Sequence, residues 1–170
     1  MILHRVFFLV LFLSLFVTTS FSQDNSLLDS LPTTKEGFIK SEPAVINTIN
    51  WLENTQLNQE TDKRKQLYAK FLEWLTNSPT VTIDIDSKTT PFAKKNPDLL
   101  FMFMGGWTKY TLQNSYSKDA VKCNVAGIKT AIKVYQMGNG IKKDKEMEKI
   151  IEIDSKNGLE DWVASQLEQK

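Results

Sequence analysis

Histidine and cysteine are almost missing from this sequence. Its 170 residues include one histidine, His4, and one cysteine, Cys123. His4 belongs to a segment that we expect to be removed, so the mature chain has no imidazole for general-base catalysis or zinc binding. Histidine-dependent triads and thiol–histidine catalysis are therefore excluded. Cys123 has no partner for an intramolecular disulfide, and we expect a small buried residue rather than an intermolecular bridge or a reactive thiol.

A large excess of charge of one sign is also missing. The chain has 21 basic and 20 acidic residues, which gives a formal net charge of +1 at pH 7, and no long run carries one sign. Proteins that bind nucleic acids usually carry a basic patch that neutralises phosphates. The composition therefore predicts no nucleic-acid partner.

The longest apolar run lies near the N-terminus and is too short to cross a bilayer. It extends from Val6 to Val17, about 12 residues interrupted by Ser14, whereas a membrane-spanning helix needs roughly 20. Arg5 precedes it and small polar residues follow it, which is the order of a secretory signal peptide. We predict a signal peptide over residues 1–22, cleaved near Ser22, and a mature chain in the periplasm or outside the cell. The alternative is an uncleaved anchor.

The mature chain is predicted to be one mainly α domain of five or six helices around a single core. Residues 23–42 have no sustained hydrophobic period, so we expect a flexible or loosely docked N-terminal arm. The helical domain would cover residues 43–170. Its expected helices run from 43 to about 55, from about 58–62 to 77, from 96 through 107, from 119 to 137, from 143 onward, and from 159 to 167.

Residues 99–107 are apolar or glycine on every helical face. Such a segment predicts a helix buried at the centre of a bundle, or one that packs between subunits in a self-assembling protein. Gly105 and Gly106 would each cost roughly 1 kcal/mol in a helix interior. We therefore expect either the close approach of another backbone or a kink at these glycines.

The segment Thr80–Asp86 is the only part with strict alternation of aliphatic and polar residues. This pattern favours either a short β-strand with one buried face or an extended connection that docks on the helices. Asp84 and Asp86 would share a face, where two carboxylates could bind a cation or act as an acid and a base. The remaining positions of a calcium loop hold two lysines and a threonine, however, so we predict a solvated surface and no metal site.

Two glutamates are candidates for enzymatic chemistry. Glu53 and Glu73 each lie beside a tryptophan near the end of a predicted helix. An apolar neighbour can raise the pKa of a carboxyl group toward the range that a glycosidase general acid needs. The alternative function is thus a small secreted hydrolase that acts on cell-wall polysaccharide.

Two other patterns are weaker. Trp51 and Trp74 occur in a repeated Trp-Leu-x-Asn-Ser/Thr pattern, which indicates either aromatic platforms for a ligand or two similar helix ends. Ser115 and Lys118 have the spacing of a serine–lysine hydrolase motif, but the further motifs of those enzymes are missing.

The hypothesis that best fits these residues is an exported, non-catalytic binding or protein-interaction module. Its partner would be an unidentified protein or small molecule. The sequence identifies no catalytic, cofactor-binding or metal-binding residue, and it predicts no cofactor.

Overall fold

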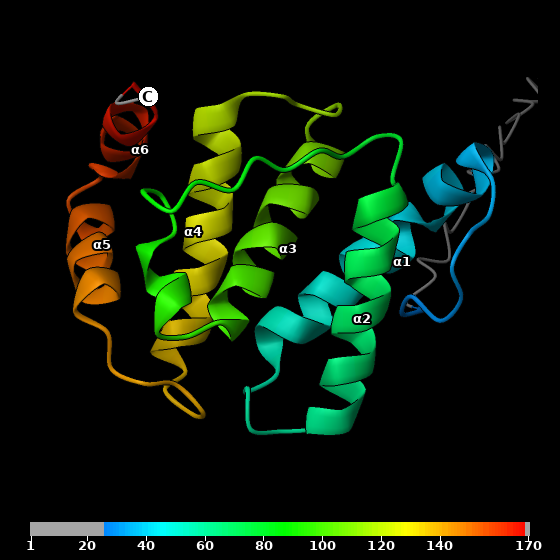
Figure 1. The fold of residues 1–170 in the computed structure, drawn as a ribbon, viewed down its shortest axis with the longest axis horizontal. Helices are drawn as coiled ribbons and strands as arrows, with labels where there is room; N and C mark the ends of the chain where they lie inside the picture. Colours follow the sequence, from blue (N-terminus) through cyan, green and yellow to red (C-terminus); the bar gives the residue numbers. More distant parts are fainter. Residues whose placement is uncertain (1–25, 169–170) are drawn as a thin grey trace, which may run out of the picture.

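The computed structural model describes residues 26–168, and their regular structure is entirely helical (Figure 1). The predicted signal peptide and the first residues of the predicted arm lie outside this range. Within it, the mainly α fold is confirmed. No helix of the described residues is long and apolar enough to cross a membrane. The helices are α1 (Lys35–Asn54), α2 (Thr61–Asn77), the short 3-10 helix η1 (Pro91–Lys94), α3 (Asp98–Gln113), α4 (Ala120–Gln136), α5 (Lys145–Ser155) and α6 (Leu159–Glu168).

The centre of the fold is the pair formed by α3 and α4, with α1 and α2 on one side and α5 and α6 on the other (Figure 1). Glycines allow this pair to pack closely. A Cβ atom built on Gly106 would lie 2.5 Å from the carbonyl oxygen of Ala126, and one on Gly127 would lie 2.6 Å from the ring of Phe103. Helix α3 continues unbroken past Gly105 and Gly106, so there is no kink, and close approach of another backbone is found at Gly106.

The first helix begins earlier than the sequence indicated. It starts at Lys35, so Pro43 lies inside α1 and residues 35–42 belong to the helix instead of the predicted arm. The Thr34 hydroxyl accepts a hydrogen bond from the amide of Gly37 at 3.1 Å and caps the helix. The side chain of Phe38 is buried. A cap and a buried aromatic residue in the extra turns offset the amide hydrogen bond that proline cannot donate.

The rest of the described arm, residues 26–34, is docked against α1. Leu28 is 2% exposed, and its amide donates to the hydroxyl of Thr48 at 2.8 Å. The side-chain amide of Asn47 donates to the carbonyl of Ser26. One buried leucine and two hydrogen bonds thus fix the path of this segment along the helix.

Side chains at the starts of α3, α4 and α5 have different roles. Asp119 and Asp144 cap α4 and α5 by accepting the amides of Lys122 and Glu146. Asn96 precedes α3 and is of a residue type that often caps helices, but here it has a different role. Its side chain accepts from the amide of Lys142 and donates to the carbonyl of Lys142, both at 2.9 Å. It therefore ties the start of α3 to the α4–α5 loop.

The segment Thr80–Asp86 is an extended connection and not a strand. It crosses over α3 and α4 before the chain turns into η1 (Figure 1). Val81 is 3% exposed and Ile83 is half-buried, whereas Ile85 is 46% exposed. Only the first two aliphatic residues therefore dock on the helices. The Asp86 carbonyl accepts the amides of Thr89 and Thr90 and ends the extended path.

Candidate binding groove

Glu53, the first candidate acid, lies at the junction of three helices. It is 6% exposed, and its two carboxylate oxygens accept from Lys109 of α3 at 2.6 Å and from Lys133 of α4 at 3.0 Å. The same lysines also donate to Asn50 and Asn54 of α1. A glycosidase general acid must direct a carboxyl proton at its substrate, but both oxygens here are already occupied by ammonium groups. The geometry gives Glu53 a structural role that joins α1 to α3 and α4.

The second candidate, Glu73, is exposed on α2. Its neighbour Trp74 is fully buried and donates through Nε1 to the Ser41 hydroxyl at 2.8 Å. Trp51 is half-buried, and the Lys63 ammonium lies 4.4 Å from the centre of its ring. Neither tryptophan offers an open platform, so the helix-end interpretation of the repeated pattern fits the structure.

Arg64 is a buried residue whose role sequence reasoning missed. It is 3% exposed and donates to the main-chain carbonyls of Leu52, in the last turn of α1, and of Thr55 and Gln56, just after it. It also donates to the Tyr68 hydroxyl at 3.3 Å. Helix ends leave carbonyl groups without intrahelical partners, and the guanidinium satisfies them. The only signal in the sequence is an arginine four residues before Tyr68, on the apolar stripe of α2.

Neither the pair Asp84 and Asp86 nor Cys123 lies in a setting that favours metal binding or catalysis. Asp84 is exposed, whereas the Asp86 carboxylate accepts the Lys88 amide at 2.8 Å and shapes a turn. The described residues contain no group of three potential metal-binding side chains. Cys123 is completely buried beside the Thr111 hydroxyl, as expected, and burial raises the pKa of its thiol.

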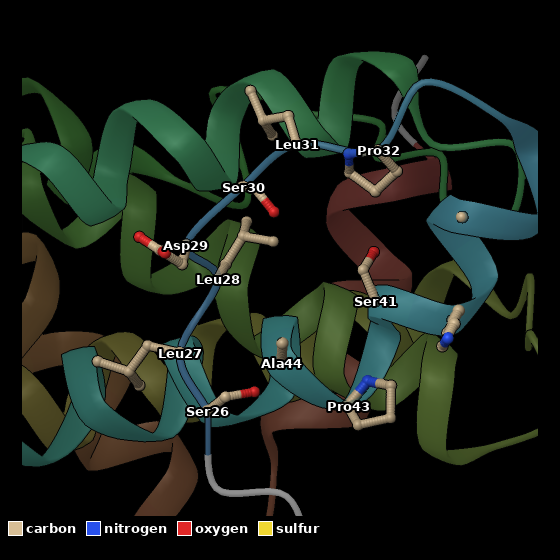
Figure 2. A pocket seen from close by; sticks show the side chains of 12 residues that line it. Ser26, Leu27, Leu28, Asp29, Ser30, Leu31, Pro32, Ser41, Pro43 and Ala44 are labelled. Carbon is tan, nitrogen blue, oxygen red and sulfur yellow. The ribbon is translucent and has the colours of Figure 1, made fainter.

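One groove lies between the arm and α1, and we call it the arm groove. It has a volume of about 530 Å³, and Figure 2 shows Pro32 and Ser41 on opposite sides of it. The hydroxyl of Ser41 donates to the Phe38 carbonyl and accepts from Trp74. Asp29 is paired with Lys70 at 3.1 Å. The side chains of Ser41 and Asp29 are therefore already engaged within the fold.

A second groove, of about 400 Å³, lies between the extended connection and the facing ends of α3 and α4. We call it the α3–α4 groove. It is lined by Pro79, Thr80, Thr82, Asp84, Trp107, Thr111, Ser117, Lys118 and Ala120. Trp107 is 5% exposed, so the groove lies over the core. Of the serine–lysine pattern, Lys118 lines this groove and Ser115 does not.

The two walls of the α3–α4 groove are linked by Glu42 of α1. One carboxylate oxygen accepts from the Thr80 hydroxyl at 2.8 Å, and the other accepts from the Tyr116 hydroxyl at 3.1 Å. Thr80 belongs to the extended connection, and Tyr116 belongs to the α3–α4 loop. The hydrogen bond to Glu42 raises the pKa of Tyr116. Glu42 therefore holds both walls at a fixed separation.

The loop that forms one wall has a strained backbone. Ser115 and Tyr116 have φ angles of 54° and 57°, in the left-handed region that residues other than glycine rarely adopt. Two consecutive residues of this kind cost of order 1–3 kcal/mol each. Such strain is concentrated at functional sites. It sets the path of the chain into Ser117 and Lys118, which line the groove.

Two polar side chains in the α3–α4 groove have no hydrogen-bond or ion-pair partner among residues 26–168. They are the hydroxyl of Thr82 and the ammonium of Lys118, both on exposed residues. The Ser117 hydroxyl, in contrast, accepts from the amide of Asp119. The groove thus combines fixed walls with polar groups that a ligand can bind. Comparisons of this chain with protein families, curated proteins and solved structures give no match.

Proposed function

We propose that this protein is a non-catalytic binding module and that the α3–α4 groove is its binding site. The observation that carries the proposal is a pair of polar side chains, Thr82 and Lys118, that have no partner in the described part of the chain and line a groove whose walls are linked by Glu42. Its volume of about 400 Å³ falls in the range of about 300–1,000 Å³ that is typical of ligand sites. The buried cluster around Glu53 lies outside this groove and stabilises the fold.

The lining of the α3–α4 groove favours a polar ligand without a large net charge. It has one acidic residue, Asp84, one basic residue, Lys118, and several hydroxyl groups. Electrostatic complementarity mainly sets which partners are accepted. Asp84 would repel a polyanion, and Lys118 would repel a polycation. A short peptide or a small neutral polar molecule meets neither difficulty.

The site is tested by NMR titration of isotopically labelled protein with a library of short linear peptides and a library of oligosaccharides. We expect members of one library to shift the amide signals of Thr82, Ser117 and Lys118. Thr82→Arg should abolish these shifts because its side chain fills the groove. Thr76→Arg, at an exposed position of α2, is the matched control, and this variant should bind as the wild type does. Binding that maps to the arm groove, or that survives Thr82→Arg, would refute the proposal, as would no binding from either library.

We further propose that the module acts outside the cytoplasm after removal of residues 1–22. This rests on the apolar run Val6–Val17 and the small residues that follow it. N-terminal sequencing of the protein from fractionated cells tests the proposal. The expected result is a chain that begins at Gln23 in the periplasmic or extracellular fraction. A chain found only in the cytoplasm, with residues 1–22 attached, would contradict it.

A further inference from the structure

The extended connection beside the α3–α4 groove has unused main-chain hydrogen-bonding groups. Among the described residues, Thr82, Ile83 and Ile85 make no backbone–backbone hydrogen bond. Earlier in the segment, the amide of Val81 donates to the Ser78 hydroxyl. Residues 82–85 belong to no helix, follow a drawn-out path across α3 and α4 (Figure 1), and have no neighbouring strand among residues 26–168. A row of unpaired amides and carbonyls in an extended chain is a template for pairing with another strand.

Side chains of this segment point alternately to the groove and to the core. Thr80, Thr82 and Asp84 line the groove, whereas Val81 and Ile83 pack toward the core. In an extended chain, the amides and carbonyls of alternate residues point to the same edge. Ile83 and Ile85 therefore offer two donors and two acceptors on one edge. The Thr82 side chain, between these two residues in the chain, lines the groove.

We infer that the ligand of the α3–α4 groove is an extended peptide that adds as a β-strand to the edge formed by Ile83 and Ile85. This inference rests on the proposed function and specifies its ligand class. In this mode of recognition, main-chain hydrogen bonds give affinity, and pockets for alternate side chains give specificity. The groove would accept alternate side chains of the peptide next to Thr82 and Lys118. An oligosaccharide could use the groove but has no regular main-chain pattern that matches this edge.

The groove volume and its charges also fit a short stretch of peptide. About 400 Å³ holds only a few residues, so the paired segment is short. Asp84 and Lys118 balance one another, which suits a peptide chain whose main-chain groups are polar and neutral. Unlike a second copy of the whole domain, a short peptide needs no large complementary surface.

The test begins with a linear peptide selected from a random display library on the folded protein. Each of its amides is then methylated in turn, which removes one donor without changing the side chain. Strand pairing predicts that affinity falls at least tenfold at every second position and changes little at the positions between. Alanine substitution of the same residues is the control for side-chain contributions. A peptide that binds in the groove without this alternation would overturn the inference and leave the proposed function standing.

Two protein variants test the edge directly. Ile85→Pro removes the amide donor of an exposed residue, and Ile85→Ala keeps the donor while removing most of the side chain. We expect at least a tenfold loss of peptide affinity for Ile85→Pro and less than a threefold change for Ile85→Ala. Retained helical circular dichroism would show that each variant is folded. Equal affinities of the two variants would overturn the inference.

Hydrogen exchange supplies a readout that does not depend on substitutions. The bound peptide should slow exchange at the amides of Ile83 and Ile85 at least tenfold. If only oligosaccharides shift the groove signals, the peptide assignment fails while the binding site stands. If sedimentation shows a dimer that protects these amides without peptide, the occupant is a second copy of this chain and the inference fails. If no ligand reaches the groove, both proposals fail.

Discussion

Gly106→Ala tests the close packing of α3 on α4. The added Cβ would lie 2.5 Å from the main-chain carbonyl oxygen of Ala126, 2.5 Å from the Thr130 hydroxyl oxygen and 2.8 Å from the Thr130 Cβ. All three distances are far below normal van der Waals contact. The carbonyl oxygen belongs to the backbone of α4, so no side-chain rotation relieves the clash. The two central helices must move apart to accept a single methyl group.

The magnitude follows from two opposing effects. Overpacking of a well-packed core typically costs about 1–3 kcal/mol, and a backbone obstacle places Gly106→Ala toward the upper end. Alanine is better than glycine in a helix interior by about 1 kcal/mol. The expected net loss in the free energy of unfolding is about 2 kcal/mol. For a domain of this size, that lowers the melting temperature by roughly 4–8 °C.

The neighbouring glycine provides the matched control. A Cβ on Gly105 would meet only the Cγ2 methyl of Ile49, at 3.1 Å, and that side chain can shift. Helix propensity offsets this smaller strain, so Gly105→Ala should stay within about 0.5 kcal/mol of the wild type. Urea unfolding followed by circular dichroism measures both variants. Equal stabilities of the two variants, or a wild-type value for Gly106→Ala, would refute the packing described here.

Three further predictions concern ionisable groups. Burial raises the pKa of Tyr68 from 10.0 to about 12, so the folded state keeps this proton while the unfolded state loses it. The free energy of unfolding should therefore fall by on the order of 2–3 kcal/mol as the pH rises from 10 to 12. Urea titrations of Tyr68→Phe should show a clearly weaker fall over the same pH range. An identical pH dependence of the two proteins would count against this assignment. Glu53→Gln should lower the free energy of unfolding by about 1–3 kcal/mol. Lys133→Met should lower it by less, because Lys133 is more exposed than Glu53. The reverse order in chemical denaturation would be inconsistent with the buried cluster. Glu42→Gln should weaken the link between the groove walls and broaden the NMR signal of Tyr116 while the helix content stays unchanged, and an unaltered Tyr116 signal would argue against that link.

The helices were predictable because their signals are local. Apolar residues at helical spacing and capping side chains such as Asp119 and Asp144 depend only on nearby sequence. The start of α1 was missed because proline usually marks a first turn, and the buried contact of Phe38 that extends the helix is a tertiary effect. Close approach at Gly106 was one of two alternatives, the other being a kink, and its partner on α4 depends on how the helices pack.

The candidate site was less predictable than the fold. Asn96 has the sequence context of a helix cap, and only the position of the α4–α5 loop gives it another partner. Glu53 resembles a catalytic acid beside a tryptophan until Lys133, 80 residues away, is placed against it. The α3–α4 groove brings Thr82 together with Lys118. Because these residues are far apart in the sequence, no local pattern indicated that they line the same groove. The positive φ angles of Ser115 and Tyr116 were also not predictable, because neither residue is of a type that favours them.

Intermolecular nuclear Overhauser effects test most directly whether the α3–α4 groove is a ligand site. A peptide from the display selection would be titrated into labelled protein at saturation. We expect contacts from peptide protons to the Thr82 methyl group and to the side chain of Lys118. Contacts instead to Leu27 and Leu31 in the arm groove, or none to the α3–α4 groove, would contradict it.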